Sequence, residues 1–93
     1  MAQIVQIDNR WELAGDILID NANTLLMESK GLSISSNTQV DFANVAEIDT
    51  AAISLILEWQ RRAITENQQL KFVNLPGNLI SLTQLYGVAD LVD

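Results

Sequence analysis

The chain contains no cysteine and no histidine, and these two absences exclude much of the chemistry that proteins perform. Without cysteine there is no disulfide and no thiolate nucleophile. Without histidine there is no imidazole base, and nearly all zinc and copper sites are ruled out. The remaining carboxylates show no EF-hand spacing, and the sequence has no Walker, dinucleotide-binding or nucleophile-elbow motif. We therefore expect a protein that is not an enzyme and that holds neither a metal nor another cofactor.

Basic residues are also scarce: five lysines and arginines stand against twelve acidic residues, which gives a net charge of -7 at pH 7. Such a chain repels nucleic acid and gains no electrostatic attachment to an anionic membrane. No apolar run approaches the ~18–20 residues of a membrane span, and Met1 to Arg10 lacks the features of a signal peptide. A protein with a basic surface remains as a partner, and the lack of cysteine fits a cytoplasmic location.

Apolar residues are plentiful enough for one core, because 48% of the 93 residues are hydrophobic and no repeat or linker divides them. We expect a single domain over residues 1–93. Alternation, caps and stop signals predict a hairpin over Met1–Gly15, a helix over Asn21–Lys30, a strand over Gln39–Phe42, a loop over Asn44–Glu47, a helix over Thr50–Asn67, a strand over Leu70–Leu75 and a helix from Asn78 to Gly87. This order predicts an α/β fold in which a small mixed sheet of about four to five strands packs with three to four helices.

The helix predicted over Thr50–Asn67 has an apolar stripe and one favourable charge pair. Apolar residues recur at helical spacing and predict one buried face, made of Ile53, Ile56, Leu57, Ala63 and Ile64. On the opposite side, Glu58 and Arg62 are four residues apart, so we expect them to form an ion pair. In the last predicted helix, the apolar face is expected to use Leu79, Leu82 and Tyr86.

The start of this helix carries the most informative pair in the chain, Asp49 and Thr50. Only one of them can be the N-cap whose side chain satisfies the first free backbone N–H groups. The other stands beside the positive end of the helix dipole, where a hydroxyl can meet a partner or carry a phosphate. The residues alone favour a plain N-cap at Thr50. For Asp49, capping and a partner contact are equally open.

Four further residues of this helix extend the candidate surface beyond Asp49 and Thr50. Ala51 and Ala52 are small enough to let another backbone approach, although alanine is also simply the best helix former. Leu55 and Trp59 widen the apolar arc, and an exposed tryptophan is a favoured interface anchor. The pattern favours burial for Leu55 and an interface for Trp59. The candidate partner-binding set is therefore Asp49, Thr50, Ala51, Ala52, Leu55 and Trp59.

The segment Val40–Asn67, VDFANVAEIDTAAISLILEWQRRAITEN, resembles the signature of STAS domains. In that signature a strand ends in Asp-hydrophobic, here Asp41-Phe42, and a loop leads to Asp-Ser/Thr at a helix start, here Asp49-Thr50. The segment Leu70–Val92, with its Leu-Tyr-Gly, is similar to the stand-alone STAS subunits of the Mla phospholipid-transport system. One departure is Ala51-Ala52, where many members have glycine after the hydroxyl residue.

This resemblance implies a non-catalytic interaction subunit. It would bind the cytoplasmic ABC ATPase of a bacterial phospholipid transporter, with Thr50 at the contact, and would lie in the cytoplasm, peripheral to the inner membrane. The wider family includes antagonists of anti-sigma factors, in which a partner kinase phosphorylates the serine or threonine at this position. The resemblance therefore also implies an alternative in which Thr50 is a phosphoacceptor and the partner is an anti-sigma kinase.

Overall fold

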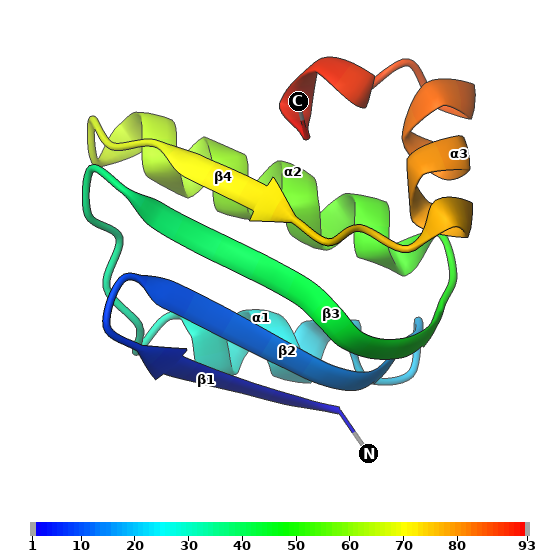
Figure 1. Cartoon of the computed structure of the whole chain (residues 1–93), viewed down its shortest axis with the longest axis horizontal. Coiled ribbons are helices and arrows are strands. Elements are labelled where there is room, and N and C mark those ends of the chain that lie inside the picture. The colour runs from blue at the N-terminus through cyan, green and yellow to red at the C-terminus, as the bar shows by residue number, and fades with distance from the viewer. Residues whose placement is uncertain (1, 93) are drawn as a thin grey trace.

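A four-stranded sheet organises the protein, and helices α1 and α2 lie together behind it in Figure 1. The computed structural model describes residues 2–92. Its elements are β1 (Gln3–Ile7), β2 (Arg10–Ile17), α1 (Ala22–Ser29), β3 (Thr38–Ile48), α2 (Ala51–Thr65), β4 (Leu70–Val73), α3 (Gly77–Leu85) and the short 3-10 helix η1 (Ala89–Leu91). This arrangement confirms the predicted mixed α/β fold.

The strands lie in the order β1-β2-β3-β4, with β1 antiparallel to β2 and the other neighbouring pairs parallel. Because parallel strands point the same way, β2, β3 and β4 all end at one edge of the sheet, which we call the carboxyl end. Helices α1 and α2 start there, as Figure 1 shows, so the connections at 18–21 and 49–50 meet at this end.

The core lies between the sheet and the two helices. Side chains alternate across a strand, so the buried strand residues lie on one face of the sheet. They are Ile4, Trp11, Leu13, Ile17, Thr38, Val40, Phe42, Leu70 and Phe72. Their neighbours Val5, Gln39 and Lys71 are exposed.

Strand β3 continues through the predicted loop Asn44–Glu47, so that prediction was wrong. The segment shows no apolar alternation, and its residues are mostly exposed. It is held instead by backbone pairing with β2, in which Ala14 faces Asn44 and Gly15 faces Val45. The register shifts there, and Gly15 has a φ of 85°, a conformation that glycine adopts without strain.

The buried face of α2 is rotated from the predicted stripe. Leu57 and Ile64 are exposed, whereas the helix buries Ala52, Ile53, Leu55, Ile56, Trp59 and Ala63. The reason is that α1 packs beside α2, so residues on the α1 side are covered as well as those on the sheet side. Trp59 is 1% exposed, packs edge-on against Trp11 with ring centroids 5.7 Å apart, and donates its indole N–H to Ser29 Oγ at 2.8 Å.

Arg62 joins the two helices and does not pair with Glu58, contrary to the predicted ion pair. Its guanidinium donates to the backbone carbonyls of Ser29, at 2.9 Å, and of Leu32. Ser29 is the last residue of α1 and Leu32 follows it, and the Ser29 carbonyl also accepts the backbone N–H of Leu32 at 2.9 Å. Arg62 also pairs with Glu66 at 2.7 Å, while Glu58 pairs with Arg61 at 3.3 Å. Arg62 on α2 therefore closes the C-terminal end of α1, in the sense that its guanidinium donates hydrogen bonds to the carbonyls there.

Replacing Arg62 by methionine is expected to lower the free energy of unfolding by about 1.5–3 kcal/mol, because charged hydrogen bonds to partly buried carbonyls are lost. Urea denaturation of the two proteins measures this difference. Arg61→Met is the matched control, since the Arg61 side chain is 74% exposed and its ion pair should contribute about 0.5 kcal/mol or less. Equal losses in both variants would show that Arg62 does not close α1.

Candidate functional site

The first turn of α2 shows which member of the Asp49–Thr50 pair is the cap. Asp49 Oδ1 accepts the backbone N–H of Ala51 at 2.8 Å. Thr50 precedes the helix with helical dihedrals, φ -62° and ψ -18°, and its side chain makes no capping hydrogen bond. Because Asp49 performs the capping, the exposed Thr50 hydroxyl is the spare group of the pair.

Asp49 also holds the connection that leads from β2 to α1. Its second carboxylate oxygen accepts the N–H of Ile19 at 2.9 Å. Asn21 secures the same connection, since its amide donates to the carbonyl of Asp16 and its Oδ1 accepts the N–H of Leu18. With its backbone fixed in this way, Ile19 projects outward and is 77% exposed.

A narrow ridge of small residues separates two hollows at this end of α2. The ridge consists of Thr50, Ala51 and Ser54. The first hollow, of about 340 Å³, lies between α1 and α2, and Ile19 and Leu26 contribute to its walls. The second, of about 300 Å³, lies on the other side of the ridge and is lined by Thr50, Ile53, Ser54 and Tyr86.

Three residues of the predicted partner-binding set are core residues. Ala52 and Trp59 are each 1% exposed and Leu55 is 3% exposed. The prediction that Trp59 is a surface anchor was therefore wrong, because Trp11 and α1 cover its ring. Leu55 reaches the surface only as part of the first hollow's lining.

The other three residues of the set lie at the surface. Thr50 is exposed, and Asp49 and Ala51 are half-buried. Both carboxylate oxygens of Asp49 nevertheless accept backbone N–H groups, so this side chain mainly fixes the backbone around the site.

The exposed apolar side chains beside the ridge are Ile19 and Tyr86, and sequence analysis found neither. Tyr86 was expected on the buried face of the last helix, but it follows α3 as its C-cap and is 56% exposed. Ile19 stands in the apolar run Ile17–Ile19, in which Ile17 alone is fully buried. Helical spacing placed Tyr86 on the buried face, but α3 ends at Leu85, and Ile19 lies beyond the end of β2, so neither residue follows the pattern of a regular element.

Asp41, the acidic residue of the Asp41-Phe42 pair, has a structural role. Its Oδ1 accepts the N–H of Ala43 at 2.8 Å and the side-chain amide of Asn74 at 3.0 Å. Within residues 2–92, no group of three acidic side chains is arranged to hold a metal ion. In the same part of the chain, none of the helices combines the length and the apolar character needed to cross a membrane.

Comparison with known proteins gives the family. The family model described as "Mlab, STAS domain" matches residues 2–93. The chain belongs to this family of STAS domains. No match was found among curated proteins.

Two solved structures share the fold of this STAS domain. The anti-sigma factor antagonist SpoIIAA in its unphosphorylated form is 10% identical, with a TM-score of 0.63 over 91% of this chain and 83% of that one. A protein named Mglu is 22% identical, with a TM-score of 0.60 over 81% of this chain but only 20% of its own length. At these identities the likeness concerns the fold alone.

The capping assignment can be tested by stability measurements on two alanine variants. Asp49→Ala is expected to lower the free energy of unfolding by about 0.5–2 kcal/mol, because the N-cap bond is lost. Thr50→Ala should change it by about 0.5 kcal/mol or less, since the threonine side chain is exposed and makes no capping bond. Chemical denaturation gives both values, and a larger loss in the Thr50 variant would contradict the assignment.

Proposed function

We propose that this STAS domain is a non-catalytic interaction subunit that binds the ABC ATPase of a bacterial phospholipid transporter of the Mla type. The observation that supports this proposal best is the Thr50 ridge, where an exposed hydroxyl that makes no capping hydrogen bond lies between two hollows. The description of the matching family, with its reference to Mlab, supports the choice of partner. The absence of histidine and cysteine from the chain supports a role without catalysis.

The shape of the ridge suits a docking partner. Small side chains at Thr50, Ala51 and Ser54 permit close approach of a second backbone. The exposed side chains of Ile19 and Tyr86 then contact it from either side. Exposed apolar groups around a tight contact are typical of interfaces, where a few buried anchors supply most of the binding energy.

Docking would regulate the ATPase only by binding one of its conformations more tightly than another, because a ligand shifts an equilibrium by its difference in affinity. In this proposal the domain lies in the cytoplasm and is held at the inner membrane through the transporter complex, without inserting into the membrane itself.

A second candidate function is a phosphorylation-controlled regulator of an anti-sigma kinase, in which Thr50 accepts the phosphate. The fold shared with SpoIIAA and the free Thr50 hydroxyl favour it. One feature of the chain counts against it, because Ala51 stands where many members of the wider family have glycine.

Intact-mass measurement of the protein purified from its native host separates the two functions. The transporter function predicts an unmodified chain, whereas the regulator predicts one phosphate on Thr50 in a large share of the molecules. Tandem mass spectrometry of the peptide that contains Thr50 locates the group. Stoichiometric phosphate at Thr50 would favour the second function.

Ile19→Ser and Tyr86→Ala are each expected to weaken binding of the ATPase subunit by about 1–3 kcal/mol, because each removes an exposed anchor beside the ridge. Isothermal titration calorimetry gives the affinities, and circular dichroism checks that the variants fold. Ile64→Ser is the matched control, because Ile64 is 74% exposed but lies near the far end of the same helix. If all three variants lose affinity equally, the Thr50 ridge is not the docking site.

A further inference from the structure

We propose that the hollow between α1 and α2 receives an apolar side chain of the partner protein, and that lysine or arginine residues flank this side chain on the partner. The inference rests on the proposed docking function and specifies the chemistry of the partner's segment. Two observations carry it: the apolar lining of the hollow, and the separation of acidic from basic side chains over the molecule.

The hollow is open to solvent and has a largely apolar lining. Its walls come from Ile19 and Leu26 on one side and from Ala51 and Leu55 on the other, within a volume of about 340 Å³. Polar residues complete the lining, namely Asn23, Thr50, Ser54 and Glu58, and Glu58 is already paired with Arg61 at 3.3 Å. Such a lining favours an aliphatic or aromatic side chain over a charged one, because burying an unpaired charge there has a large desolvation cost.

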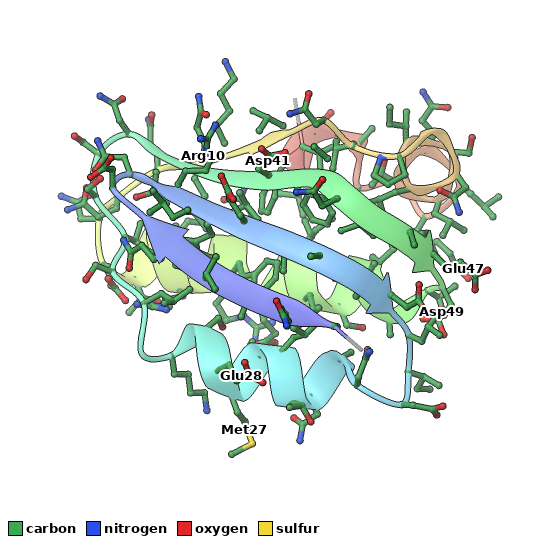
Figure 2. All side chains as sticks on the ribbon, turned by 60° about the horizontal axis from the view of Figure 1, so that its bottom comes forward. Arg10, Met27, Glu28, Asp41, Glu47 and Asp49 are labelled. Atoms are coloured by element: carbon green, nitrogen blue, oxygen red, sulfur yellow. The ribbon has the colours of Figure 1, made fainter. Side chains whose placement is uncertain are left out.

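Four carboxylates gather around the carboxyl end, and none of them forms an ion pair among residues 2–92. They are Asp16, Asp20, Glu47 and Asp49, and we call this set the acidic end. Figure 2 shows Glu47 and Asp49 close together at the end of the sheet, well away from Arg10.

The basic side chains lie elsewhere, near the starts of β2 and β4 and at the C-terminal ends of α1 and α2. All five belong to this other part of the molecule: Arg10, Lys30, Arg61, Arg62 and Lys71. Arg61, the nearest to the ridge along α2, is separated from Thr50 by eleven residues, which corresponds to roughly 16 Å along the helix. This distance exceeds the Debye length at physiological salt, so the positive charge of Arg61 offsets the negative charge of the acidic end only weakly.

Two members of the acidic end are free to meet a partner's cations. Asp16 and Asp49 already accept backbone N–H groups, whereas the exposed Asp20 and Glu47 accept no hydrogen bond from residues 2–92. Asp20 follows the exposed Ile19 directly, and Glu47 lies two residues before the cap of α2. Asp20 and Glu47 therefore place negative charge at the end of the molecule that carries the hollow, which favours a lysine or arginine beside the apolar side chain on the partner.

Charge complementarity of this kind mainly raises the rate of association and makes it depend on salt. We expect the double variant Asp20→Asn, Glu47→Gln to associate with the ATPase subunit about 3- to 10-fold more slowly than wild type at low ionic strength. The difference should shrink as salt is added, because screening removes the attraction in wild type. Surface plasmon resonance over a series of salt concentrations gives the rates.

The matched control is the double variant Asp8→Asn, Glu28→Gln, which removes the same net charge from exposed positions outside the acidic end. Its association rate should stay within about twofold of wild type, since steering depends on local charge. Equal slowing in both double variants would overturn the inference, because net charge would then explain the effect. A wild-type association rate that does not change with salt concentration would also overturn the inference.

The hollow itself is tested by filling it. Asn23→Phe adds an aromatic ring at the mouth of the hollow from an exposed position, and it should raise the dissociation rate at least about fivefold. Thr24→Phe is the control, because residue 24 is also exposed on α1 but does not line the hollow. An unchanged dissociation rate in the Asn23 variant would overturn the apolar part of the inference.

The same experiment separates this inference from the proposed function. If the wild-type domain does not bind the ATPase at all, the proposed function fails and this inference fails with it. If the domain binds tightly but neither the acidic end nor the hollow affects the rates, only this inference fails.

Discussion

The candidate site depends on the carboxylate of Asp49. One oxygen accepts the N–H of Ala51 and caps α2, and the other accepts the N–H of Ile19. The first bond leaves Thr50 without a structural task, and the second fixes the connection to α1 against the start of α2. A single side chain therefore places an unbonded hydroxyl and an exposed apolar group next to each other on the surface.

Hydrogen bonds join helices α1 and α2, which carry this surface, at the ends that lie farther from it. Trp59 donates to the hydroxyl of Ser29, and Arg62 donates to the carbonyls of Ser29 and Leu32. These bonds join the second half of α2 to the end of α1, so the walls of the hollow at their opposite ends are held in place. A site on fixed elements loses little conformational entropy when a partner binds.

Shape and charge are the means of recognition that this chain offers. Its Thr50 ridge has small side chains for close approach, and the carboxylates of its acidic end form no ion pairs within residues 2–92. The family of STAS domains, to which the chain belongs, provides a fold in which this surface lies at the carboxyl end of a parallel sheet.

The order of elements, the position of Asp49 and Thr50 at the start of a helix and the shortage of reactive groups could all be determined from the sequence, because periodicity, caps and composition are local properties. Tertiary structure decided the rest. Helical spacing shows which residues share a face, but not which face a neighbouring element covers. The position of α1 therefore decided that Trp59 is buried while Leu57 and Ile64 are exposed. In the same way β2 extended β3 through a segment without apolar alternation, and the backbone bond to Asp49 turned Ile19 outward.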